Sequence, residues 1–275
     1  MAFVVFCALA LLLVAGLLFQ PKWLAYRRAR VGAQAFPPGW RSILRRRVPL
    51  VRRLPADLQL QLKKHMQVFI AEKAFIGCAG LVVTEEMRVV IAAQACLLLL
   101  NRETDYFGNV RQILVYPGAF LVQRTTIDGT GVQQEHREAL AGESWSQGQV
   151  ILSWQDTLDG AAVADDGRNV VIHEFAHQLD QENGAPQGAP PPAPGNLELN
   201  ARRWSRVFQT AYEQLQAQEQ QGYQGLLNHY GAQAPAEFFA VVSEVFFEQG
   251  QALHAYDPAL YQALRSYYQV DPASW

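Results

Sequence analysis

The amino-acid sequence predicts an α+β fold, mainly helical with a small β-sheet, preceded by one N-terminal transmembrane helix. The first reason is that residues 2–19 carry no charge. At about 1.5 Å per residue, this run spans most of a ~30 Å hydrocarbon layer. The second reason is that apolar residues downstream recur at helical spacing, while a few short stretches rich in β-branched residues stand between turn residues. The chain has 275 residues, half of them apolar, which suffices for one well-packed domain.

Charge divides the chain into two parts. Residues 1–56 contain ten of the 23 Lys and Arg residues and no acid, whereas residues 57–275 contain 13 basic and 25 acidic residues, a net charge of -12. A nucleic-acid enzyme needs a basic face on its folded domain to neutralise phosphates, so direct nucleic-acid binding is not expected. The three cysteines, Cys7, Cys78 and Cys96, show no metal-binding or redox spacing.

The basic residues all follow the apolar run, which by the positive-inside bias places the remaining chain in the cytoplasm. We therefore expect a single-pass protein of the inner (cytoplasmic) membrane. A cleaved signal peptide is the alternative, but such a peptide begins with a basic region, and here only Ala2 follows Met1. The expected organisation is a transmembrane helix at residues 1–20, a basic juxtamembrane linker at 21–53, and the folded domain at 54–275. The linker charges could rest on lipid headgroups or simply be solvated.

Helices and strands of the domain follow from periodicity and turn signals. The apolar run at 89–100 is only twelve residues long, which suits a buried core helix and not a second span. Five prolines mark residues 183–195 as a loop, which could border a cleft as a lid. The predicted helices cover residues 54–72, 85–100, 170–179, 197–218, 236–247 and 258–268, and the predicted strands cover 113–116, 120–125 and 149–154.

The chemistry of the chain centres on the run His173-Glu174-Phe175-Ala176-His177. On a helix, residues four apart lie on one face, so His173 and His177 can bind one zinc ion, with Glu174 beside it as the general base that activates a water. A shuffled sequence of this composition contains such a match with a probability of roughly 0.007, so chance is a poor explanation. The alternative is a pair of histidines hydrogen-bonded inside a core.

A catalytic zinc site usually has three protein ligands and an open position for water. No histidine or aspartate stands six residues after His177, which favours a downstream glutamate. Glu237 and Glu244 lie seven residues apart and share one face of a predicted helix, and residue chemistry does not choose between them. Asp180 could orient an imidazole, or cap the end of the helix or the loop after it. Glu244 and Glu248 could equally hydrogen-bond a ligand or be solvated.

Several segments together resemble the Mlc titration factor A family of zinc peptidases over about residues 48–272. They are residues 173–180 (HEFAHQLD), the upstream Trp145-Ser146-Gln147-Gly148, and Tyr230 followed by Pro235-Ala236-Glu237-Phe238-Phe239-Ala240. The spacing of a tyrosine seven residues before a Glu-Phe-Phe-Ala run also resembles that in the catalytic domain of anthrax lethal factor. The resemblance implies a zincin-like metallopeptidase domain with Zn²⁺, Glu237 as the third ligand, and Tyr230 as the catalytic residue that stabilises the oxyanion.

We therefore expect a zinc metallopeptidase, an aminopeptidase or an endopeptidase, acting on a peptide or protein substrate. The alternative is a regulatory binding protein that sequesters a transcription repressor of the Mlc type, with the zinc site kept for folding. A membrane-bound scaffold without enzymatic activity is a third reading, and it predicts no stoichiometric metal. We also expect the strand at 149–154 to offer an exposed edge to an extended substrate.

Overall fold

The computed structural model describes residues 1–127, 133–140, 142–145, 148–184, 187–188, 190 and 197–275. Within these ranges the chain is α+β and mainly helical, as the sequence predicts. The α-helices are α1 (Ala2–Gly32), α2 (Pro38–Arg47), α3 (Ala56–Glu72), α4 (Glu85–Ala95), α5 (Trp154–Ala162), α6 (Val170–Asp180), α7 (Leu197–Gln220), α8 (Pro235–Glu248), α9 (Gly250–Tyr256) and α10 (Pro258–Tyr268). The 3-10 helices are η1 (Pro49–Arg52), η2 (Cys96–Leu99), η3 (Gln181–Asn183), η4 (His229–Ala232) and η5 (Pro272–Ser274). The strands are β1 (Ala74–Gly77), β2 (Gln112–Tyr116), β3 (Phe120–Ile127), β4 (Gln133–Leu140), β5 (Gly142–Trp145) and β6 (Gln149–Ser153).

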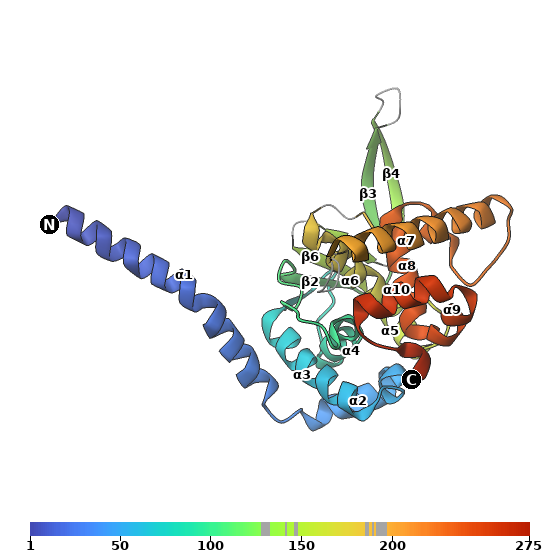
Figure 1. The fold of residues 1–275 in the computed structure, drawn as a ribbon. Coiled ribbons are helices and arrows are strands. Elements are labelled where there is room, and N and C mark those ends of the chain that lie inside the picture. Colours follow the sequence, from blue (N-terminus) through green and yellow to red (C-terminus); the bar gives the residue numbers. More distant parts are fainter. Residues whose placement is uncertain (128–132, 141, 146–147, 185–186, 189, 191–196) are drawn as a thin grey trace.

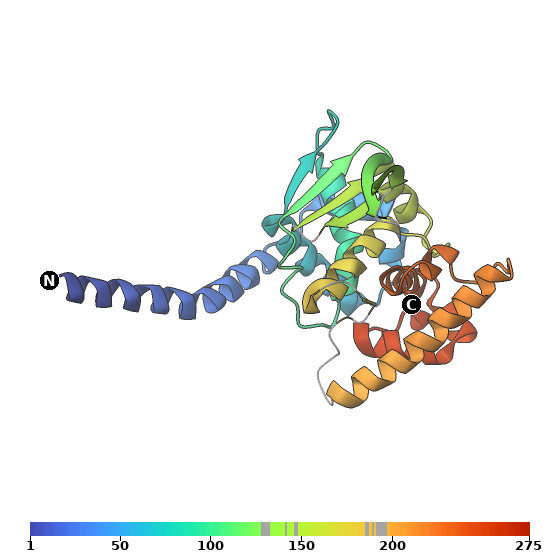
Figure 2. The same ribbon diagram turned by 90° about the horizontal axis from the view of Figure 1, so that it is seen from above.

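Four strands form the main sheet in the order β1-β2-β6-β5. β1, β2 and β6 are parallel, whereas β5 runs antiparallel to β6 and ends the sheet within the described residues. On one face of the sheet, Ile113 and Val115 of β2 and Val150 and Leu152 of β6 are buried and join the core. Figure 2 shows the sheet and helices α7 to α10 on opposite sides of α6. Helix α6 therefore packs against the sheet on one side, where it contacts β5 and β6.

The apolar run at residues 89–100 lies in the centre of the domain. Every residue from Val89 to Leu100 is buried, and α4 continues as η2 through this run. The prediction of a core helix is confirmed for this segment. Thr84 caps α4, since its side chain accepts a hydrogen bond from the backbone N–H of Met87.

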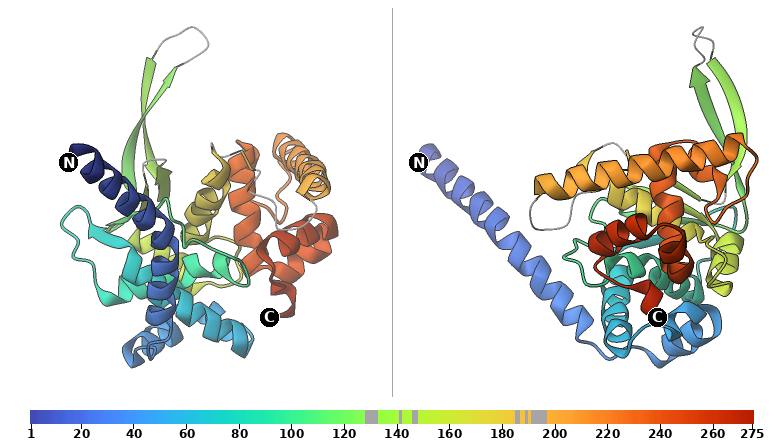
Figure 3. Two further views of the ribbon diagram at one scale, coloured as in Figure 1. Left: turned by 60° about the vertical axis from the view of Figure 1, so that its left-hand side comes forward. Right: turned by 45° about the vertical axis from the view of Figure 1, so that its right-hand side comes forward.

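The N-terminal helix α1 continues past residue 20 to Gly32 without a break and extends away from the domain (Figure 1, Figure 3). Among the residues whose side chains are described, which leave out most of residues 2–18, no helix is both long enough and apolar enough to cross a membrane. The last turns of α1 contact α3.

The segment predicted as a basic linker, residues 21–53, differs in the structure. It completes α1 and then forms α2 and η1, which pack on the domain. The reason is a set of apolar side chains between the arginines that enter the core: Phe36, Ile43, Leu44, Val48, Leu50 and Val51. Several of the basic side chains also form ion pairs with the acidic domain. Arg46 and Arg47 both contact Glu86.

A hairpin of β3 and β4 projects from the domain (Figure 1). The two strands pair antiparallel from Phe120↔Leu140 to Ile127↔Gln133. The predicted strands at 113–116, 120–125 and 149–154 are all present, whereas β1, β4 and β5 were not expected. Most of the Pro-rich loop at 183–195 lies outside the described residues, so its role as a lid stays a prediction.

Candidate metal centre

Helix α6 holds the His-Glu pair and is fixed at its start by its own capping residue. The side chain of Asn169 accepts a hydrogen bond from the backbone N–H of Ile172 at 3.0 Å, a typical N-cap. The apolar face of α6 enters the core, where the ring of Phe175 lies 4.7 Å from that of Phe107, centroid to centroid. Burial of this face leaves His173 and His177 directed toward α8.

Helix α8 faces α6 and supplies a carboxylate in its first turn. Pro235 opens α8, a position where its missing N–H costs nothing. Phe238, Phe239 and Val242 are almost completely buried and hold α8 in the core. Glu237 therefore lies at the positive end of the helix dipole, which favours a carboxylate.

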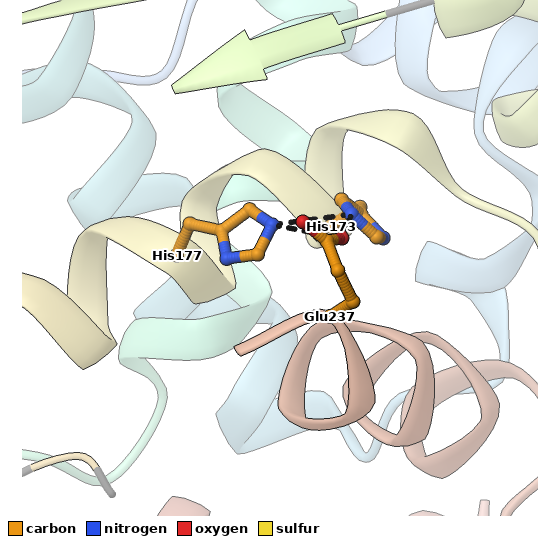
Figure 4. Close-up of side chains that lie close together, drawn as sticks. All are labelled: His173, His177 and Glu237. Carbon is orange, nitrogen blue, oxygen red and sulfur yellow. Dashed lines mark hydrogen bonds and ion pairs between the residues drawn. The ribbon is translucent and has the colours of Figure 1, made fainter. Parts of the chain in front are cut away.

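His173, His177 and Glu237 bring three ligand atoms together. The Nε2 atoms of the two histidines are 3.2 Å apart. The Oε2 atom of Glu237 lies 3.0 Å from Nε2 of His173 and 3.4 Å from Nε2 of His177. Figure 4 shows the two rings and the carboxylate directed toward one another from α6 and α8. All ligand atoms lie within 4.8 Å of one another, so they could hold one metal ion.

Glu244 occupies the other side of the His173 ring. Its Oε1 atom lies 2.8 Å from Nδ1 of His173, whereas Glu237 contacts Nε2 of the same ring. Glu237 and Glu244 lie on one face of the helix, as the sequence predicts, but they contact different nitrogen atoms of the His173 ring. Glu237 lies with the converging Nε2 atoms, and Glu244 lies behind the imidazole.

The electrostatics of this cluster favour a positive charge between the side chains. Burial lowers the pKa of His173, but hydrogen bonds to Glu237 and Glu244 outweigh it and raise the pKa well above its ordinary value. For the carboxyl group of Glu237, burial has the opposite sign and raises the pKa. Hydrogen bonds with both histidines outweigh burial and hold this pKa below the usual range. Without a metal, the two glutamates favour the protonated form of the His173 imidazole.

Glu174 and Tyr230 lie beside the cluster. Glu174 is only 5% exposed, and its charge helps to raise the pKa of His173. The ring of Tyr230 lies 5.8 Å from that of His173, centroid to centroid. Asn228 holds the start of η4 by accepting a hydrogen bond from the backbone N–H of Tyr230 at 2.9 Å. Gly231 lets η4 approach α8 closely, since a Cβ there would lie 3.3 Å from Cβ of Val241.

Comparison with known proteins decides the family. The sequence profile described as "Glucose-regulated metallo-peptidase M90" matches residues 23–269. The chain belongs to this family. An uncharacterized protein of Synechocystis sp., slr2042, is 41% identical over 253 residues, which cover 92% of this chain and 91% of that protein. The Mlc titration factor A proteins of Yersinia pestis and Yersinia pseudotuberculosis are each 32% identical over 228 residues, 82% of both chains.

Membership of the M90 family supports a metallopeptidase, and the donor set fits a metal. Two imidazole nitrogens and one carboxylate oxygen are suited to a borderline-soft divalent ion such as zinc. A divalent cation would replace the proton in the charge balance of the cluster. The side chains that converge are therefore chemically matched to the metal that the family requires.

Other candidate residues of this M90 family member are placed differently. Oδ2 of Asp180 accepts a hydrogen bond from the backbone N–H of Gly188 at 2.7 Å, which fits the loop-capping alternative. His229, the neighbour of Tyr230, is not among the expected ligands, and its Nε2 atom lies 2.9 Å from the backbone oxygen of Tyr223. The sequence left open whether Glu248 supports the site or is solvated, although its position one turn beyond Glu244 on the same helix face is a usable signal.

Proposed function

We propose that this chain is a zinc-dependent peptidase of the His-Glu-x-x-His type. The observation that carries the proposal is the convergence of His173, His177 and Glu237 within 4.8 Å in a member of a metallopeptidase family. These three side chains would hold the ion and would leave room for a water beside it. Zinc, when bound, supplies Lewis-acid chemistry and lowers the pKa of water toward ~7.

Glu174 is proposed as the general base. It accepts a proton from the water whose oxygen attacks the peptide carbonyl carbon. As the C–N bond breaks, Glu174 returns the proton to the leaving nitrogen, so the products are one carboxyl group and one amine. Its burial and its position next to His173 support this role, because a base must lie within reach of the attacking water.

Tyr230 is proposed as the donor to the developing oxyanion. A phenol O–H that donates to this oxygen acts mainly in the transition state and therefore raises kcat more than it improves substrate binding. The closeness of its ring to His173 supports the proposal. The anchoring of η4 by Asn228 and Gly231 supports it further, since an oxyanion donor must be held in place.

An extended peptide substrate is proposed to pair with β5. The expectation that the strand at 149–154 offers its edge was wrong, because β6 is flanked on both sides by β2 and β5. β5 is the last strand of the sheet in the described residues, and it contacts α6. Main-chain pairing at such an edge binds peptides without strong side-chain preference. Proline substitutions in β5 should raise the KM for peptides more than they lower zinc content.

The decisive test of the peptidase is Glu174→Gln. This change keeps the shape of the side chain but removes its ability to accept a proton, so hydrolysis of a peptide library should fall by about 10²–10⁴-fold. Zinc content by elemental analysis should stay stoichiometric. Glu219→Gln, the same change at an exposed position of α7, is the control and should leave hydrolysis unchanged. Unaltered hydrolysis in Glu174→Gln would exclude this residue as the base.

A second candidate function is capture of a transcription repressor of the Mlc type. It is supported by the relatives named Mlc titration factor A. In that case the metal site would serve folding alone. Purified repressor added to Glu174→Gln separates the two functions, because binding should persist where hydrolysis is lost. A chain that binds the repressor but hydrolyses no peptide, even as wild type, would favour this second function.

We also propose that α1 anchors the chain in the inner membrane, with the domain in the cytoplasm. The support is the uncharged run at residues 2–19, the basic residues that follow it, and the extension of α1 away from the domain (Figure 3). The wild-type chain should stay in the membrane pellet after carbonate extraction, whereas a chain lacking residues 2–20 should be released. Equal release of both chains would exclude the anchor.

A further inference from the structure

We infer that Glu244 is a positioning residue of the metal centre, which orients the His173 imidazole and ties it to the first turn of α6. The inference rests on the proposed function, since it assigns a role toward the metal that His173, His177 and Glu237 would hold. Glu244 itself is no ligand in this proposal, because it lies on the side of His173 away from the converging Nε2 atoms.

Both oxygens of Glu244 are engaged, each by a different part of α6. Nδ1–H of His173 donates to Oε1 at 2.8 Å. The backbone N–H of Asn169 donates to Oε2. With Nδ1 carrying the proton, Nε2 of His173 keeps its lone pair for a metal. Glu244 is 8% exposed, so water does not compete strongly for these contacts.

Glu248 lies one turn beyond Glu244 on α8 and contacts the residues at the start of α6. Its Oε1 atom accepts a hydrogen bond from the side-chain amide of Asn169 at 2.9 Å, and its Oε2 atom accepts one from the backbone N–H of Arg168 at 3.1 Å. Asn169 is also the N-cap of α6. Glu237, Glu244 and Glu248 thus lie on one face of α8. Glu248 contacts only the residues before α6, whereas Glu244 also contacts the metal-binding histidine.

Only a carboxylate satisfies both donors at position 244. A glutamine has one oxygen and one NH₂ group. If its oxygen faces His173, its NH₂ faces the N–H of Asn169, and two donors oppose each other. If it is flipped, the NH₂ faces Nδ1 of His173 and favours the tautomer with the proton on Nε2, which blocks metal binding. Glu244→Gln therefore damages the site in either orientation, although its volume is unchanged.

The test measures zinc affinity of the full chain by competition with a chromophoric chelator. Glu244→Gln should weaken zinc binding by about 10- to 100-fold, while the melting temperature of the zinc-free protein shows that the variant folds. The matched control is Glu248→Gln, because it places the same change on the same face of α8, against the same end of α6, without touching an imidazole. It should change zinc affinity by less than about threefold.

A second readout is the His173 Nδ1–H proton in the NMR spectrum of the zinc-loaded protein. In the wild type and in Glu248→Gln, this proton should be shifted downfield and protected from exchange. In Glu244→Gln, it should show neither the downfield shift nor the protection. Equal zinc affinities for wild type and Glu244→Gln would overturn the inference, as would an equal loss in both variants. A wild-type chain that binds no zinc would instead refute the proposed function.

Discussion

Arg28 on α1 and Glu72 on α3 form an ion pair with two hydrogen bonds, each 2.9 Å long. The guanidinium group of Arg28 also donates to the backbone oxygen of Asp105 at 2.7 Å and lies 4.7 Å from the ring centroid of Tyr106. The side chains of the pair are only 17% and 15% exposed. These contacts join the last turns of α1 to the folded domain.

Replacing Arg28 by alanine should therefore release the end of α1. Because Glu72 loses its partner in a partly buried place, we expect a loss of about 1–3 kcal/mol in the free energy of unfolding, measured with urea. Trypsin should also cleave faster after Arg27 and Arg30. The control is Arg41→Ala, since Arg41 is exposed on α2. Cleavage at an unchanged rate would mean that the ion pair does not hold α1.

Tyr230→Phe removes one hydroxyl group beside the metal centre. If the hydroxyl donates to the oxyanion, kcat should fall by about 10²-fold with KM and zinc content nearly unchanged, since the contact forms mainly in the transition state. Steady-state kinetics on a fluorogenic peptide would measure this. Tyr223→Phe, at an exposed tyrosine, serves as the control. A rise in KM at constant kcat would instead assign Tyr230 to substrate binding.

Zinc should stabilise the wild-type chain but not the variant Glu237→Gln. A metal that binds only the folded state adds about 4 kcal/mol at a free concentration 1,000 times its dissociation constant. Removing zinc with a chelator should therefore lower the melting temperature of the wild type, and adding it back should restore the value. Glu237→Gln lacks the third ligand and should show little change. A zinc-induced shift as large as in the wild type would exclude Glu237 as a ligand.

The elements that the sequence predicted well are those whose signals are local. The helix at α6 was found because Asn169 and the apolar residues after it mark its start, and the two histidines share a face by helical geometry alone. Whether Glu237 or Glu244 lies beside them could not be predicted from the residues. That depends on how far α8 is shifted along α6, which the packing of Phe238 and Phe239 in the core decides.

The segment before residue 54 was misread for a related reason. Its arginines suggested a solvated linker, whereas Ile43 and Leu44 are buried against the rest of the domain. Ion pairs such as Arg47–Glu86 join parts of the chain 39 residues apart, and no local pattern signals them. β1 was missed because it is four residues long and exposed on alternate positions, which gives too little periodicity to recognise.

The acid stability of the chain should depend on His65. Burial lowers the pKa of this side chain to about 4, against about 6.5 in the unfolded chain. Nδ1 lies 3.1 Å from the hydroxyl of Tyr106, while the buried Nε2 has no hydrogen-bond partner within the described part of the chain. Between pH 6.5 and 4 the unfolded state therefore binds more protons than the folded state, and stability falls as the pH falls.

His65→Asn removes this titration while keeping a polar atom near the position of Nδ1. Between pH 7 and 4.5 the wild type should lose about 2 kcal/mol more unfolding free energy than the variant. Urea unfolding of the zinc-free protein at both pH values measures the difference, because the metal centre then contributes equally to both chains. His254→Asn, at an exposed histidine, should behave like the wild type. Parallel acid losses in wild type and His65→Asn would show that His65 is protonated in the folded state as readily as in the unfolded one.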